Sequence, residues 1–305
     1  MNCAIIGSTK IAEVHAEQLA LNGVKEITFI SRSIQKRRKM VFKLEKKFSK
    51  DKLFLHSDIN ILKKNFFNII CICSKTEIHD KHLQIVSGLR SLVIVEKPII
   101  SLLKFKNRYK AFLSTLYKKN KKIIVCYPYL FLAKSFKKIC NYNKKIDKIN
   151  FEFQTGGTAK YKNICVNLMP HALSFFYIFL KENLLNKNIN KNYTLVEKNF
   201  WQTSFDINKI KINLIFKENY QKKTSLKLAI NDSIWIRKTK KKSGKFINYI
   251  QNSKTKKIKN ISNPMSEFYK DLFKNINNKK FYQSNKKLTI DIMKKKNFFL
   301  DNLSY

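Results

Sequence analysis

Leu92-Val93-Ile94-Val95-Glu96-Lys97-Pro98 is the most informative stretch of this 305-residue chain. Its four leading apolar residues are typical of a strand that is covered on both faces, and a charged pair and a proline follow directly. In open α/β sheets, ligands bind beyond the carboxyl ends of the strands, which is where this charged pair would lie. The stretch therefore predicts a buried parallel strand that places Lys97 at a ligand crevice.

The segments around this strand alternate between strand-like and helix-like patterns. The predicted strands are residues 2–6, 26–30, 52–55, 66–73, 92–95 and 122–126, and the predicted helices are residues 11–21, 35–48, 77–87 and 102–118. Such alternation is typical of a doubly wound parallel sheet with helices on both faces. We therefore expect an α/β Rossmann domain over residues 1–126.

After Tyr127 the hydrophobic pattern changes to strict alternation of apolar and polar residues. Residues 209–214, 226–230 and 234–236 alternate in this way, which predicts strands with one buried and one solvated face. Helices are expected at residues 171–180, 265–276 and 287–300, and Lys/Asn-rich loops near residues 183–192 and 253–262. Residues 127–305 are therefore expected to form an α+β domain with a largely antiparallel open sheet.

The net charge of +43 raises the question of a nucleic-acid partner. Only six of the 63 basic residues are arginine, the residue best suited to contact phosphates and guanine edges, and the excess is lysine, which usually marks a solvated surface. Nucleic-acid binding therefore ranks third among the possible functions, after the two given at the end of this section. The positive charge is expected to attract an anionic small-molecule substrate instead.

The spacing of the cysteines and the length of the apolar runs indicate the cellular compartment of the protein. The six cysteines have no metal-ligand spacing with histidine, so no metal site is expected and a reducing compartment is implied. No signal peptide is visible, and no apolar run approaches the ~18 residues that span a bilayer, so we expect a cytoplasmic protein without a membrane partner. His15, His56 and His82 belong to no recognisable constellation.

Two segments at the amino end predict a dinucleotide site. Gly7-Ser8-Thr9-Lys10-Ile11 occupies the turn between the first strand and the first helix, where backbone N–H groups can bind a pyrophosphate, although Thr9 stands where a glycine is usual. The second strand ends in Ser31-Arg32 without an acid nearby, and three more basic residues, Lys36-Arg37-Arg38, follow. A basic residue there accommodates the 2′-phosphate, which favours NADP and leaves NAD open.

Three further motifs carry a family resemblance. Ser74-Lys75-Thr76-Glu77-Ile78-His79 precedes Glu96-Lys97-Pro98 by one helix and strand, and Gly156-Gly157 precedes Asn167-Leu168-Met169-Pro170-His171. Together they resemble the Gfo/Idh/MocA family of glucose-fructose oxidoreductases and inositol dehydrogenases. The resemblance implies that the C-terminal helices return toward the first domain and that the chain forms a homo-oligomer.

The resemblance also implies roles for individual residues. Lys97 would be the catalytic lysine, Glu96 would help to place the cofactor and Lys97, and His171 would exchange a proton with the substrate. Ser74, Lys75, His79 and Lys97 would also bind the cofactor. His79 would in addition orient the loop near the nicotinamide. Asn167 stands where the family usually has aspartate, and Met169 where it has glycine, so the acidic partner of His171 is absent; an asparagine orients a substrate but carries no proton.

The function expected from these features is hydride transfer between NADP(H) and a hydroxyl or carbonyl carbon of a sugar or nucleotide-sugar derivative. The main alternative is a degenerate, non-catalytic member of the same fold that binds the cofactor or regulates a partner. Thr9, Asn167 and Met169 together motivate that alternative.

Overall fold

The structure is a computed structural model that describes residues 1–45, 52–140, 145–180, 189–207, 209–242 and 245–301. These residues divide into two compact units, each described here by itself. The first comprises Met1–Cys126 and Phe268–Ile290, and the second comprises Tyr127–Glu267 and the described residues from Asp291 onward. The predicted fold class, a Rossmann unit and a mostly antiparallel α+β unit, is confirmed.

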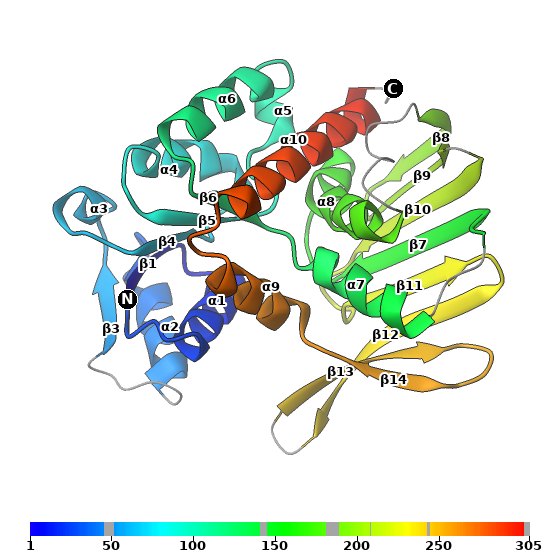
Figure 1. Ribbon diagram of the computed structural model, residues 1–305, viewed down its shortest axis with the longest axis horizontal. Helices are drawn as coiled ribbons and strands as arrows, with labels where there is room; N and C mark the ends of the chain where they lie inside the picture. Colours follow the sequence, from blue (N-terminus) through cyan, green and yellow to red (C-terminus); the bar gives the residue numbers. More distant parts are fainter. Residues whose placement is uncertain (46–51, 141–144, 181–188, 208, 243–244, 302–305) are drawn as a thin grey trace. The chain divides into compact units, whose positions relative to one another are not determined.

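The first unit is built on a six-stranded parallel sheet (Figure 1). Its strands are β1 (Asn2–Ile6), β2 (Glu26–Ile30), β3 (Leu53–His56), β4 (Ile69–Ile72), β5 (Leu92–Glu96) and β6 (Ile123–Cys126). Their order, β3-β2-β1-β4-β5-β6, reverses direction beside β1, and ligands bind at such a reversal in open α/β sheets. The central strands β1, β4 and β5 are apolar almost throughout because helices cover both of their faces.

Helices α1 and α2 lie on one face of this sheet, and α4 and α6 lie on the other (Figure 1). The helices are α1 (Lys10–Leu21), α2 (Ile34–Glu45), α3 (Ile61–Lys64), α4 (His79–Val86), α5 (Leu102–Phe105) and α6 (Tyr109–Lys119), and a 3-10 turn covers Thr76–Ile78. The single helix predicted at residues 102–118 is wrong, because a turn that contains Asn107, a residue that favours turns, separates α5 from α6. Residues 46–48 of the predicted helix 35–48 lie outside the described residues.

A returning C-terminal segment completes the first unit. Residues 268–290 belong to it, and they include most of α9 (Pro264–Lys274) and the first half of α10 (Lys279–Asp301). The side chain of Asn285 accepts a hydrogen bond from the Val125 N–H (2.9 Å) and donates one to the Val125 carbonyl (3.0 Å). This amide therefore pairs backbone groups of the edge strand β6 that no neighbouring strand reaches.

The second unit contains an eight-stranded sheet with α7 (Tyr129–Cys140) and α8 (Lys162–Phe179) on one face (Figure 1). Its strands are β7 (Lys148–Thr155), β8 (Asn190–Glu197), β9 (Phe200–Ile207), β10 (Ile210–Glu218), β11 (Ser225–Ile230), β12 (Ser233–Lys242), β13 (Lys245–Asn252) and β14 (Ile258–Ile261). The order is β14-β13-β12-β11-β7-β10-β9-β8, in which β7 and β10 pair in parallel and the other pairs are antiparallel.

Several predicted boundaries after Tyr127 are wrong. Helix α8 begins at Lys162 instead of His171 and accommodates Pro170 in its interior, because burial of most of its side chains outweighs the hydrogen bond that proline cannot make. Helix α7 was not expected, and α10 begins at Lys279 instead of residue 287. Residues 258–261, predicted as part of a loop, form β14, because pairing with β13 orders them despite their exposed side chains.

Candidate functional site

Gly7 directly follows β1 at a place where no side chain fits. Its φ of +120° is a conformation that residues with a Cβ rarely adopt. A Cβ on Gly7 would lie 2.8 Å from the Cys73 carbonyl carbon and oxygen and 2.9 Å from the Ser74 nitrogen. The ends of β1 and β4 therefore approach each other more closely than any other residue type would allow.

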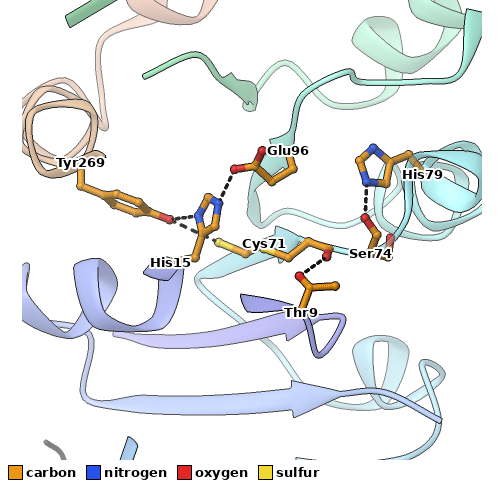
Figure 2. Close-up of polar contacts among 8 residues, drawn as sticks. Thr9, His15, Cys71, Ser74, His79, Glu96 and Tyr269 are labelled. Atoms are coloured by element: carbon orange, nitrogen blue, oxygen red, sulfur yellow. Dashed lines mark hydrogen bonds and ion pairs between the residues drawn. The ribbon is translucent and has the colours of Figure 1, made fainter. Parts of the chain in front are cut away.

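Thr9 departs from the glycine pattern without disturbing the turn. Its backbone is extended (φ −94°, ψ 165°), which any residue adopts, and its hydroxyl donates a hydrogen bond to the Cys73 carbonyl (3.2 Å, Figure 2). Lys10 and Ile11 follow as the first residues of α1; Lys10 is exposed and Ile11 is half-buried. The hydroxyl of Thr9 thus supports the β4 end of the turn.

A cavity of about 490 Å³ opens beside this turn. Seven of the twelve residues predicted to bind the cofactor line it, namely Gly7, Ser8, Thr9, Ser31, Arg32, Ser74 and Lys75. The other five, Lys10, Ile11, His79, Glu96 and Lys97, do not line it. The hydroxyls of Ser8 and Ser31 lie 3.0 Å apart, which ties the two loops on either side of the cavity together. A cavity of this size is typical of small-molecule and cofactor sites.

The cavity is mainly basic, but it contains an acid that was not expected. Arg32, Lys36, Lys75 and Lys81 line it together with Asp58, which follows β3. The interpretation that no acid lies near the end of β2 is therefore wrong, because the acid comes from the neighbouring strand and not from β2 itself. A hydrogen bond from the Asn60 N–H (2.9 Å) lowers the pKa of Asp58, so its carboxylate is ionised at neutral pH.

The three basic residues at the start of α2 have different surroundings. Lys36 lines the cavity, whereas Arg38 is exposed and does not. Arg37 is buried, and its guanidinium donates hydrogen bonds to the carbonyls of Ser31, which follows β2, and His56, which ends β3. Arg37 therefore holds the sheet edge that supports Arg32.

Two histidines organise the loop after β4. The His82 ring nitrogen Nδ1 lies 2.9 Å from the Ser74 hydroxyl, and burial together with the charges of His79 and Arg32 lowers the pKa of His82 to about 4. His79 is buried, and its two ring nitrogens face the carbonyls of Ser74 (2.9 Å) and Pro98 (3.0 Å). Burial lowers the pKa of His79 as well. Its contacts connect the loop after β4 with the loop after β5, which agrees with an orienting role.

Glu96 ends β5, and Lys97 follows it, half-buried, with a cis peptide bond to Pro98. A Glu96 carboxylate oxygen lies 2.7 Å from Nε2 of the buried His15 (Figure 2). Burial would raise the pKa of Glu96, but the hydrogen bond and charge of His15 and the charges of Lys97 and His79 lower it. Glu96 is therefore an anion beside Lys97.

His15 was missed as a member of this site. Its other ring nitrogen, Nδ1, lies 2.5 Å from the Tyr269 hydroxyl, whose oxygen is 3.8 Å from the Cys71 sulfur (Figure 2). His15 lies 81 residues from Glu96 and 254 from Tyr269 in the sequence. No spacing motif covers such separations; the only available signal was a histidine on the apolar face of the first helix.

Among the described residues, His15, Glu96 and Cys126 form a group whose possible ligand atoms lie within 4.8 Å of one another. Both ring nitrogens of His15 already have hydrogen-bond partners, which favours a hydrogen-bonded chain over a metal centre. The absence of a metal site stays a prediction.

In the second unit, Asn167 and His171 lie one turn apart on α8 and are both half-buried. The His171 ring packs against Tyr129 (centroids 4.3 Å apart) and Phe153 (5.2 Å). Met169 is fully buried, so this position contributes to the core instead of leaving room beside a substrate.

The glycine pair before α8 has a separate physical reason. A Cβ on Gly157 would lie 2.3 Å from a carboxylate oxygen of the buried Glu218, and that carboxylate accepts a hydrogen bond from the Ala159 N–H (2.5 Å). The missing side chain therefore makes room for the carboxylate that holds the loop before α8.

Comparison with known proteins supports the family resemblance. Residues 1–140 match the Gfo/Idh/MocA family, described as an oxidoreductase family with an NAD-binding Rossmann fold. No curated protein sequence matches the chain. The resemblance to this family is confirmed at the level of the Rossmann domain and of the fold.

Solved structures share the fold over nearly the whole length. A dehydrogenase from Clostridium difficile is 14% identical, with 99% of both chains covered and a TM-score of 0.69. A 3-ketoreductase from Actinomadura kijaniata, solved with NADP, is 8% identical (96% of this chain, 94% of that one, TM-score 0.72). A myo-inositol dehydrogenase from Corynebacterium glutamicum is 11% identical (96% and 94%, TM-score 0.63). At these identities the likeness establishes the fold alone.

Proposed function

Because residues 1–140 match the NAD-binding Rossmann domain of the Gfo/Idh/MocA oxidoreductases, we propose that the chain is an NADP(H)-dependent oxidoreductase. Its reaction is hydride transfer at a hydroxyl or carbonyl carbon of a sugar or nucleotide-sugar derivative. The observation that carries the proposal is the 490 Å³ cavity beside Gly7, where the absence of a Cβ brings the ends of β1 and β4 together.

The residues around the cavity fit a dinucleotide. Gly7, Ser8 and Thr9 form the turn whose backbone N–H groups and following helix suit a pyrophosphate. Arg32 and Lys36 would hold a 2′-phosphate, and four cations against one acid, Asp58, favour NADP over NAD. Lys10 and Ile11 contribute as the first turn of α1.

A prediction about Arg32 tests the cofactor preference. Arg32→Ala is expected to weaken NADPH binding by about 10- to 100-fold, the value of a charge-assisted hydrogen-bonded contact, and to leave NADH binding nearly unchanged. Fluorescence titration of both reduced cofactors measures the two dissociation constants. Arg38→Ala is the matched control, since Arg38 is exposed on α2, the helix that follows Arg32, and does not line the cavity. Equal losses for NADPH and NADH would contradict the assignment.

Three side chains would carry the proposed chemistry together with the cofactor. When bound, the nicotinamide supplies or accepts the hydride, for which no side chain is suited. Lys97 binds the substrate oxygen and stabilises the negative charge that develops on it. The His171 imidazole takes the hydroxyl proton during oxidation and returns it during reduction, and Asn167 orients the substrate by hydrogen bonds.

Cofactor titration followed by a substrate panel tests this function. We expect saturable NADPH binding in the micromolar range, and a change in nicotinamide absorbance with UDP-glucose, myo-inositol or another polyol or sugar. If the protein bound neither NADPH nor NADH, the proposed oxidoreductase function would be ruled out.

A second candidate is a non-catalytic, cofactor-binding member of the same fold. The buried Met169 and the half-buried Asn167 favour it, because neither can act as the proton carrier that an aspartate provides. Tight cofactor binding without turnover on the whole panel is the result expected for this candidate.

Partners and location stay predictions. No helix in the described part of the chain is long and apolar enough to cross a membrane. A small, anionic substrate, assembly into a homo-oligomer and a cytoplasmic location are expected on the grounds given from the sequence.

A further inference from the structure

Three side chains from distant parts of the first unit form a buried hydrogen-bonded chain that ends at Glu96, the residue before Lys97. Tyr269 lies on α9, His15 on α1 and Glu96 at the end of β5 (Figure 2). The oxygen of Tyr269 is 2.5 Å from His15 Nδ1, and His15 Nε2 is 2.7 Å from Glu96 Oε1. Tyr269 and His15 are fully buried, and the Glu96 side chain is 12% exposed, so water competes little for these contacts.

The direction of each hydrogen bond follows from the chemistry of the groups. An ionised carboxylate only accepts, so Nε2 of His15 carries the proton and donates to Glu96. Burial lowers the pKa of His15, but its interactions with Cys73 and Tyr269 raise it well above its usual value, so the ring is protonated and Nδ1 donates to the Tyr269 oxygen. Burial raises the pKa of Tyr269 well above its usual value, so the phenol stays neutral and its oxygen accepts from the ring. The Tyr269 oxygen thus fixes the orientation of the His15 ring in which Nε2 presents its N–H to Glu96.

Glu96 connects this chain to Lys97. It is the residue directly before Lys97, and the charge of Lys97 contributes to lowering the Glu96 pKa, so the two charged groups interact. Anchoring the Glu96 carboxylate on His15 therefore restricts both the backbone from which Lys97 extends and the direction of the negative charge on Glu96.

We propose that Tyr269 and His15 are positioning residues, which hold Glu96 in place so that Lys97 is presented to the substrate oxygen. This inference rests on the proposed function, since it assigns Lys97 the catalytic role. It also gives the returning segment 268–290 a function in catalysis, because α9 supplies Tyr269, whose hydroxyl is one end of the hydrogen-bonded chain.

Tyr269→Phe tests the proposal, because it removes one hydroxyl and leaves the ring. We expect kcat to fall by about tenfold, as for other outer hydrogen-bond partners of functional groups, with KM and the NADPH dissociation constant at their wild-type values. His15→Leu is expected to lower kcat by about 100-fold, and His15→Gln to recover most of this loss. The glutamine amide can donate to Glu96 and accept from Tyr269 at once.

Tyr282→Phe is the matched control, since the Tyr282 hydroxyl, which is also in the first unit, donates to the Ile276 carbonyl (2.6 Å) and has no contact with Glu96. Equal kcat values for Tyr269→Phe and Tyr282→Phe, in an active wild-type enzyme, would overturn the positioning role and leave the proposed function intact. Equal kcat values for His15→Gln and His15→Leu would also overturn it. A wild-type protein that binds NADPH and turns over nothing on the panel would overturn the proposed function, and the positioning role with it.

Discussion

Lys97→Ala is expected to lower kcat by about 10²- to 10³-fold while the NADPH dissociation constant stays near its wild-type value. The magnitude is that of removing one preorganised donor from the oxygen on which negative charge develops. Lys97 does not line the cavity that we assign to the cofactor, so cofactor affinity should be largely independent of it. Steady-state turnover on a substrate found by the panel and NADPH titration measure the two quantities separately.

Two further variants sharpen the result for Lys97. Lys97→Arg keeps a positive charge but replaces the compact ammonium by a planar guanidinium, so turnover should remain low. Lys118→Ala removes an exposed lysine of the same unit and should behave as wild type. If Lys97→Ala instead lost NADPH affinity and kept kcat, Lys97 would be a cofactor contact and not a catalytic residue.

Gly7→Ala is expected to destabilise the protein more than Gly23→Ala or Gly88→Ala and to abolish cofactor binding. The substitution places a Cβ at 2.8 Å from the Cys73 backbone and does so at φ +120°. The conformational cost of about 1–2 kcal/mol and the overpacking cost of about 1–3 kcal/mol add to about 2–5 kcal/mol. Thermal unfolding with and without NADPH measures both effects.

Variants at two other glycines distinguish the conformational cost from the overpacking cost in this loss of stability. Gly23 has a positive φ (+87°) but open space around its Cβ position, so Gly23→Ala should show the conformational cost of about 1–2 kcal/mol alone. Gly88 has neither feature, and Gly88→Ala should be neutral or stabilise the protein by up to about 1 kcal/mol. If Gly7→Ala were no more destabilising than Gly23→Ala, the close approach of β1 and β4 would not be needed.

The sequence predicts the first sheet well because its information is local. Each strand from Asn2 to Cys126 is a short apolar run bounded by turn residues, and each helix has its own apolar face. Gly7 and the basic residue Arg32 could likewise be found from their positions relative to predicted strands, and both line the cavity.

The second unit was harder to predict because tertiary packing overrides local patterns there. Pro170 favoured a helix that begins after it, whereas burial on both sides of Pro170 keeps α8 continuous. Strand β14 has exposed lysine and asparagine side chains and no apolar alternation, so only its pairing with β13 reveals it.

The local sequence pattern was sufficient to predict the strand that leads into Glu96-Lys97-Pro98, since the spacing of apolar residues depends only on near neighbours. The surroundings of that strand depend on tertiary structure. Asp58 reaches the cavity from the end of another strand. His15 reaches Glu96 across 81 residues of sequence, and Tyr269 reaches His15 across 254. These contacts form because packed helices and strands bring distant side chains together, which no periodicity along the chain records.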